Sequence, residues 1–171
     1  MDSDDYITSD MYEYMMSKIL KYNADIGICD DALEIKKTRI PLYKDVAADF
    51  YNKDRLKKGI YPCMLFSETK NEPAIAPSLC NKIIRKTILD NVLSASNENI
   101  YYGEDAICTY PCMLDAESVY IAKDKFFYIY RQTEYSLSKL KKYLSDPRFK
   151  EVFQAVKISN LDKRLKFKVH L

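Results

Sequence analysis

Histidine is almost absent from this 171-residue chain, because the single one, His170, is the next-to-last residue. A Ser-His-Asp or Cys-His active site needs a buried and oriented imidazole, and a chain terminus is a poor place to hold one. The same scarcity excludes a histidine-ligated zinc site. Any chemistry must therefore rest on carboxylates, hydroxyl groups, lysines and arginines.

Other scarcities narrow the class of protein. The five cysteines contain no Cys-x-x-Cys pair, and their odd number argues against a disulfide framework, so we expect reduced and mostly buried thiols. Three glycines and six prolines exclude a low-complexity chain. The longest apolar runs are a handful of residues, such as 126–130, and the acidic start does not resemble a signal peptide. We therefore expect a cytoplasmic protein without a transmembrane helix.

Charge is unevenly distributed although the net charge is only +2. Residues 1–31 hold eight acids and two lysines, whereas residues 123–171 hold thirteen basic residues and five acids. An acidic end suits a bound cation, and a basic end suits phosphates or an anionic membrane surface. The alternative for the basic end is a solvated helix face. The C-terminus thus leaves both alternatives open, a solvated helix face and peripheral contact with the inner face of the membrane, and no nucleic-acid partner is expected.

Alternating strands and helices predict an α/β fold, with a mixed sheet flanked by helices. The apolar and turn patterns predict helices over 9–22, 46–56, 87–93 and 106–114, and strands over 26–29, 38–43, 81–86, 118–121 and 126–130. Asp10 and Glu13 have the spacing of a capping box. A long loop is expected over 59–80, and two basic helices over 136–156.

The first residues carry the most informative pattern, Asp2-Ser3-Asp4-Asp5. Because side chains alternate along an extended chain, Asp2 and Asp4 point to the same side and can converge on one hard divalent cation. The alternative is that these acids only decorate a frayed terminus and the helix that follows.

Four segments, taken in order, resemble glycosyltransferase family 2, the inverting enzymes of the GT-A fold. They are Asp2-Ser3-Asp4-Asp5-Tyr6-Ile7 with the later Ala24-Asp25-Ile26, the Asn-Lys segment 81–86, Gly103-Glu104-Asp105, and Tyr130-Arg131-Gln132 with Ser136 five residues after the arginine. Each motif alone is short enough to arise by chance, but their order makes a specific signal over Asp2 to Ser136.

The resemblance implies a metal and donor site at the acidic start. Asp2 and Asp4 correspond to the DxD pair of the family, which holds Mn²⁺ or Mg²⁺ against the diphosphate of a nucleotide-sugar. Asp4 is the first choice for direct metal ligand, and Asp5 is a further candidate. The cation would offset the charge that the leaving diphosphate gains. Arg131 and Ser136 would contact the donor phosphate or a sugar hydroxyl, and arginine suits a bidentate grip.

The resemblance also implies a catalytic base. Asp105 would remove the proton of the acceptor hydroxyl as that oxygen attacks the anomeric carbon, and Glu104 is the second candidate for this role. A carboxylate at a helix N-terminus is favoured in its ionised form, as a base requires. Direct attack inverts the configuration, so no enzyme nucleophile and no histidine is needed.

The chain begins one residue before DxD, whereas in the family a nucleotide-binding half precedes that motif. We expect residues 1–135 to be the acceptor-side part of such a domain and 136–171 a basic helical extension. The implied reaction transfers a sugar, from a donor expected to be UDP-linked, to a saccharide or lipid-linked acceptor in surface polysaccharide synthesis. Three alternatives stand beside it: a fragment, a split enzyme completed by a partner chain or by self-association, and a non-catalytic interaction or scaffold module.

Overall fold

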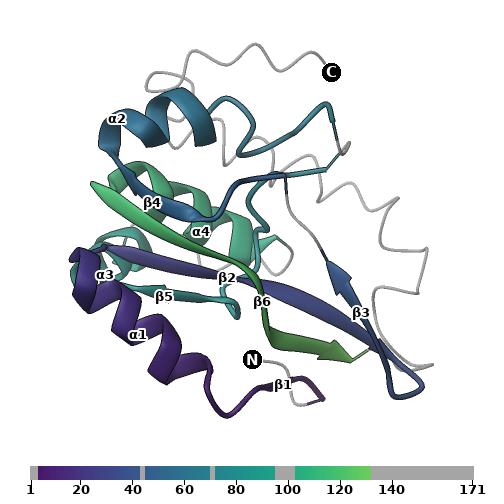
Figure 1. Cartoon of the computed structure of the whole chain (residues 1–171). Coiled ribbons are helices and arrows are strands. Elements are labelled where there is room, and N and C mark those ends of the chain that lie inside the picture. The colour runs from purple at the N-terminus through teal and green to yellow at the C-terminus, as the bar shows by residue number, and fades with distance from the viewer. Residues whose placement is uncertain (1–3, 43–44, 70–71, 95–102, 132–171) are drawn as a thin grey trace.

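Two long parallel strands, β2 (Ile26–Ile35) and β6 (Ser118–Arg131), form the centre of a six-stranded mixed sheet (Figure 1). The computed structural model describes residues 4–42, 45–69, 72–94 and 103–131. Four short strands pair antiparallel with the central two. Next to β2 lie β3 (Thr38–Leu42) and β5 (Lys82–Ile84), and next to β6 lie β1 (Tyr6–Ile7) and β4 (Asp49–Asn52).

Helices cover both faces of the sheet, as the sequence predicts. Helix α1 (Met11–Tyr22) packs Met11 and Met15 against Cys29, Ala122 and Phe127. The neighbouring side chains along the central strands point the other way and join a larger core with α3 (Lys86–Ser94) and α4 (Glu104–Asp115). This alternation is the two-residue period of a strand that is buried on both faces.

Gly27 allows α1 to lie close to β2. A Cβ atom built on it would stand 2.9 Å from Ile19 Cδ1 and 3.0 Å from Met15 Cε. Any larger side chain would therefore displace those two side chains. The absence of a side chain at this position thus sets the distance between the helix and the sheet.

The helices predicted over 9–22, 87–93 and 106–114 are confirmed as α1, α3 and α4. The capping box is not formed: Asp10 is the N-cap residue of α1, but it has helical backbone angles and its side chain makes no capping hydrogen bond. No helix among the residues that the structure describes is both long and apolar enough to cross a membrane.

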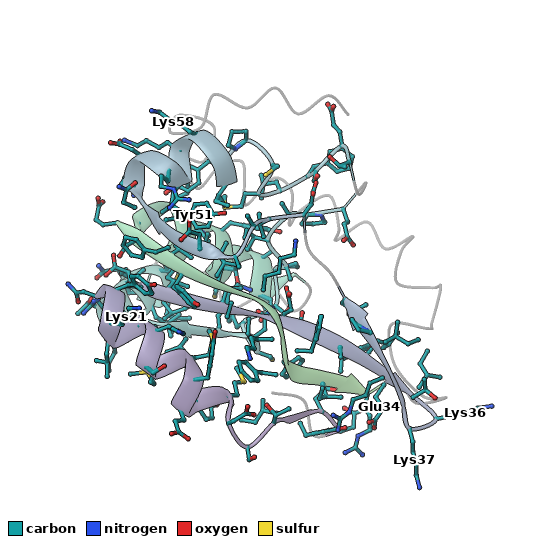
Figure 2. The ribbon with its side chains drawn as sticks, in the orientation of Figure 1. Lys21, Glu34, Lys36, Lys37, Tyr51 and Lys58 are labelled. Carbon is teal, nitrogen blue, oxygen red and sulfur yellow. The ribbon has the colours of Figure 1, made fainter. Side chains whose placement is uncertain are left out.

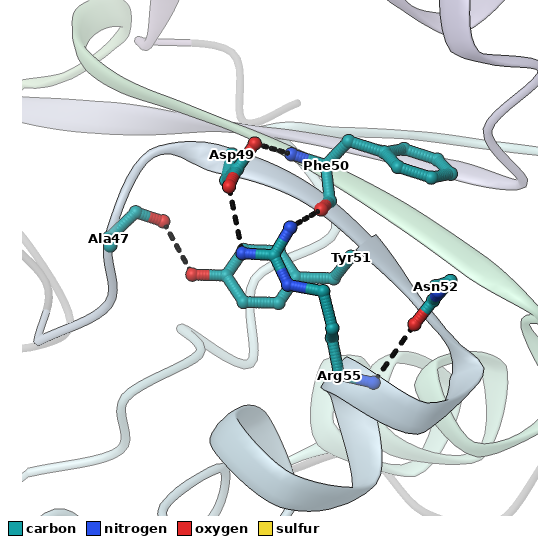
Figure 3. A network of polar contacts seen from close by, with 6 residues as sticks. All are labelled: Ala47, Asp49, Phe50, Tyr51, Asn52 and Arg55. Carbon is teal, nitrogen blue, oxygen red and sulfur yellow. Dashed lines mark hydrogen bonds and ion pairs between the residues drawn. The ribbon is translucent and has the colours of Figure 1, made fainter.

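The helix predicted over 46–56 is wrong in its first half, where β4 pairs with β6 instead (Figure 3). The side chain of Asn52 accepts a hydrogen bond from the Arg55 amide at 3.0 Å and so begins the helical turns α2 (Lys53–Arg55) and η1 (Leu56–Ile60). The Arg55 guanidinium then binds back to the Phe50 carbonyl and the Asp49 carboxylate. An N-cap at Asn52 leaves the preceding aromatic residues free to form a strand.

The central strands are longer than their sequence patterns predict. The strands expected over 118–121 and 126–130 are one strand, β6, and the strand expected over 26–29 continues to Ile35. The register shift between Cys29 and Asp30 accommodates the polar stretch between the two apolar runs of β6, and a second shift between Asp30 and Asp31 skips Phe127. A bulge absorbs unpaired residues without ending the ladder, so the polar interruption does not act as a loop.

Candidate functional site

Asp5 fastens the acidic N-terminal segment to the end of β6. Its side chain is buried, and its two carboxylate oxygens accept hydrogen bonds from the Tyr128 hydroxyl and, at 2.8 Å, from the Arg131 backbone amide. Burial, followed by the hydrogen bonds with Asp5 and Cys80, raises the pKa of the Tyr128 hydroxyl well above its usual range. The hydroxyl therefore stays protonated and acts as a donor. The first and last motifs of the sequence meet at this carboxylate.

Asp4 lies in the turn before β1 and is half-buried, so it sits beside a fixed residue rather than on a loose end. Among the described residues no group of three or more His, Cys, Asp or Glu side chains is placed to hold a metal ion. One or two carboxylates are enough for Mg²⁺, whose other ligands are then water and substrate phosphates. Asp4, next to the anchored Asp5, stays a predicted ligand for an ion of that kind. Asp2, the other member of the predicted DxD pair, lies outside the described residues.

Arg131 belongs to a polar cluster at the ends of the central strands. Its Nε stands 3.7 Å from Glu34 Oε1, and Arg39 Nε stands 3.6 Å from Glu34 Oε2. The Tyr6 hydroxyl donates to Glu34 Oε2 at 2.6 Å and accepts from Arg39 at 3.0 Å. Ser136, the predicted companion of Arg131, lies outside the described residues.

Glu34 gives this cluster a pH dependence. The hydrogen bond from Tyr6, followed by the contacts with Arg39 and Arg131, lowers the pKa of the Glu34 carboxyl. Because the folded pKa lies below the unfolded one, the stabilisation is present above about pH 4.3, the pKa of a free glutamate, and is lost as the pH falls through the folded pKa.

We therefore expect the difference in melting temperature between the wild type and Glu34→Gln to be largest near pH 6 and to shrink below about pH 4. Thermal melts across this range measure it. The variant Glu68→Gln, which removes an exposed carboxylate elsewhere, serves as the control. A difference for Glu34→Gln that does not change with pH would contradict the ion-pair account.

Asn81 and Lys82 brace a segment of the chain against the sheet. The side-chain amide of Asn81 donates to the Cys29 backbone carbonyl at 3.1 Å. In return, the Cys29 backbone amide donates to the Asn81 backbone carbonyl at 3.0 Å. The buried Lys82 ammonium donates to the Ala76 carbonyl at 2.8 Å, to the Ser78 carbonyl at 2.5 Å and to Asn81 Oδ1 at 2.7 Å. Two of these three hydrogen bonds reach residues 76 and 78, so one lysine fixes the 72–80 segment to the sheet.

Lys82→Met is expected to lower the free energy of unfolding by roughly 2 to 4 kcal/mol, because it leaves these buried acceptors without their donor. Urea denaturation measures the change. Lys86→Met is the matched control, because the Lys86 side chain is 84% exposed and its pair with Asp90 is a surface ion pair. Equal effects of the two substitutions would contradict the bracing role.

Glu104 and Asp105 occupy the first turn of α4, directly after Gly103. Gly103 has a positive φ of 77°, and its carbonyl accepts from the Ala106 amide at 3.0 Å, so the turn of the chain places both acids at the helix N-terminus. Glu104 is exposed, and Asp105 is half-buried. The dipole of a twelve-residue helix favours negative charge at that end.

Helix α4 is tied to the segment that Lys82 fixes. The Thr109 hydroxyl donates to the Pro77 carbonyl at 2.5 Å, and the Tyr110 hydroxyl donates to the Ile75 carbonyl at 3.2 Å. The helix that carries the predicted base and the Asn-Lys segment are therefore linked through residues 72–80.

Sequence reasoning missed the buried polar residues of the central strands. Asp30 and Asp31 are buried in β2, although strand interiors seldom hold acids. Burial is the largest cause that raises the pKa of the neighbouring Cys29 thiol to about 12. The two acids raise this pKa further, and Lys82 lowers it. The sequence pattern that could have revealed these buried residues is the pair of consecutive acids within an apolar strand. Tyr128, the partner of Asp5, gave none, because it is one of fifteen tyrosines.

The arrangement of the sheet and its helices is a glycosyltransferase-like fold. It is shared by crystal structures of TarS, a glycosyltransferase of S. aureus. For TarS 1–349 the TM-score is 0.63 at 19% identity, over 95% of this chain and 40% of that one. For its complex with UDP-GlcNAc the TM-score is 0.65 at 20% identity, and for the complex with UDP it is 0.59 at 18%. At these identities the likeness concerns the fold alone.

The chain spans 40% of the length of TarS 1–349. No protein-family model and no curated protein matches the sequence. The expectation of an α/β mixed sheet flanked by helices is confirmed, whereas membership of family 2 stays a prediction from the motifs.

Proposed function

We propose that this chain is the acceptor-side part of an inverting glycosyltransferase of family 2 that uses a nucleotide-diphospho-sugar, with UDP as the nucleotide. The observation that carries the proposal is the fold shared with TarS over 95% of the chain. Structures of TarS 1–349 are complexes with UDP and with UDP-GlcNAc, so the fold accommodates such a donor. In this chain the same fold joins the acidic segment to β6 through Asp5.

The proposed reaction is a single displacement. The acceptor hydroxyl oxygen attacks the anomeric carbon while the bond from that carbon to the diphosphate breaks and its electron pair leaves on the diphosphate. Asp105 takes the hydroxyl proton, and Glu104 is the second candidate for that role. Attack from the face opposite the leaving group inverts the configuration.

Asp4 and Asp2 would hold Mn²⁺ or Mg²⁺, which supplies positive charge to the leaving diphosphate. Asp5 is the further metal candidate, and its two hydrogen bonds give it a second role in orienting its neighbour. Arg131 and Ser136 would grip the donor phosphates or a sugar hydroxyl. The proposed acceptor is a saccharide or a lipid-linked saccharide in surface polysaccharide synthesis. The basic residues after 131 would contact the inner face of the membrane.

The second candidate function is a non-catalytic interaction or scaffold module derived from such an enzyme. The observation that favours it is that both carboxylate oxygens of Asp5, one of the predicted metal ligands, are engaged by the Tyr128 hydroxyl and the Arg131 amide. In this case the sheet would pair with a partner chain or with a second copy. Both candidates use the same fold, and donor turnover separates them.

Donor turnover is measured as UDP release from UDP-GlcNAc with Mn²⁺. Two proteins are compared: this chain, and a chimaera in which it replaces the corresponding part of TarS 1–349. We expect the chimaera to release UDP when acceptor is present and to lose this activity on Asp4→Asn. A folded chimaera that binds UDP but releases none from the donor would support the non-catalytic module instead.

A further inference from the structure

A row of alternating charges crosses three neighbouring strands where β2 and β6 end. Glu34 on β2 is in register with Arg39 on β3 and with Arg131 on β6. Residues in register on adjacent strands point to the same face, so the two arginines stand on either side of one carboxylate. Figure 2 shows Glu34 close to the turn of the β2–β3 hairpin, with Lys36 and Lys37 projecting from that turn.

The Tyr6 side chain contacts both arginines. The guanidinium carbons of Arg39 and Arg131 lie 5.6 Å and 5.0 Å from the centre of its ring, within the range of a cation–π contact. Its hydroxyl bridges Glu34 and Arg39, as described above. One ring therefore contacts both guanidinium groups, which fixes the position of each relative to Tyr6 before any ligand binds.

The row carries one more positive than negative charge. Both ion pairs are long, at 3.6 Å and 3.7 Å, so neither arginine makes the short bidentate contact that would use up its donors. The arginine side chains are 54% and 48% exposed, whereas that of Glu34 is 15% exposed. One Arg39 nitrogen already donates to the Tyr6 hydroxyl. Both arginine side chains nevertheless stay about half exposed around a carboxylate that is largely covered.

We propose that Arg39 and Arg131 together bind a phosphate group. Guanidinium groups match the oxygens of a phosphate, these two flank Glu34, and the pair lies at the carboxyl ends of parallel strands, where open α/β sheets bind ligands. The Arg131 amide also binds Asp5, so the pair adjoins the acidic segment. Under the proposed function the phosphate belongs either to the donor diphosphate or to a phosphorylated acceptor, and the chemistry is the same for both.

The test titrates inorganic pyrophosphate into the full chain without divalent metal, while the arginine Nε–H signals are followed by NMR. We expect the signals of Arg39 and Arg131 to shift together, and Arg39→Gln to weaken binding about tenfold or more, as the loss of a charge-assisted hydrogen bond predicts. Arg39→Lys keeps the charge but not the fork and should be intermediate. Arg55→Gln removes an equally exposed arginine, on α2, and should bind like the wild type.

A second titration identifies the source of the phosphate. If UDP with Mn²⁺ displaces pyrophosphate and Arg39→Gln weakens UDP binding, the pair serves the donor; if pyrophosphate stays bound beside UDP, it serves the acceptor. Pyrophosphate binding that needs Arg39 in a chain that binds no UDP would uphold the phosphate site and count against the proposed function. Equal binding by Arg39→Gln and Arg55→Gln, or none by the wild type, would overturn the inference.

Discussion

Asp105→Asn is expected to lower the rate of sugar transfer by roughly 10² to 10⁴-fold, the range for loss of a general base. The amide keeps the size of the carboxylate but cannot accept the proton of the acceptor hydroxyl. Asp105 lies in the first turn of α4 and is half-buried, so the fold should tolerate the change. The rate is measured in the chimaera with TarS at saturating donor and acceptor, and the melting temperature is measured in parallel.

Glu104→Gln is the matched control for this prediction. It removes the same charge from the same helix turn, but its side chain is exposed, so it should reduce transfer far less. The reverse order of effects would assign the base to Glu104. Equal transfer by the wild type and Asp105→Asn would remove the base from this helix altogether.

Asp5→Asn is expected to lower the free energy of unfolding by roughly 2 to 4 kcal/mol. The estimate rests on hydrogen bonds to a charged group, each of which contributes about 1.5 to 3 kcal/mol. The amide offers one acceptor oxygen where the carboxylate satisfies two donors, the Tyr128 hydroxyl and the Arg131 amide. In a chain of this size the loss corresponds to a fall in melting temperature of about 5 to 12 °C.

Tyr128→Phe provides the comparison, because it removes one of the two donors and leaves Asp5 bound to the Arg131 amide. It should cost less than Asp5→Asn, and the double variant should cost less than the sum of the two. Additive losses would show that the two side chains do not interact. A loss below about 0.5 kcal/mol for Asp5→Asn, the usual range of a surface substitution, would contradict the anchoring role.

The elements with a clear period were predictable from the sequence. The apolar stripe of α1 and the acids that open α4 both identify helices, and the structure has them. The failures have one physical cause, which is that pairing with a distant strand decides the local structure. Phe50 and Tyr51 fit a helix by pattern but pair with β6, and the polar stretch in β6 looks like a loop but is bridged by a bulge against β2.

The candidate site was predictable in its residue types but not in its contacts. The motif pattern drew attention to Asp4, Asp5 and Arg131 as separate groups. Their connection through the Arg131 amide depends on the register between β1 and β6, which places residues 126 positions apart side by side. Arg39 has no motif at all. Its place beside Glu34 follows only from the register of the β2–β3 hairpin.

The most direct test of the central claim, that the acidic segment forms a metal and nucleotide-diphosphate site, is a thermal melt of the chain with Mn²⁺ alone, UDP alone and both together. At about a hundred times its dissociation constant a ligand adds roughly 2.7 kcal/mol of stability. The account predicts a rise in melting temperature that requires both components and is lost in Asp4→Asn but kept in Asp10→Asn, an exposed acid nearby. A chain that melts cooperatively with no such rise, or an equal rise in both variants, would contradict it.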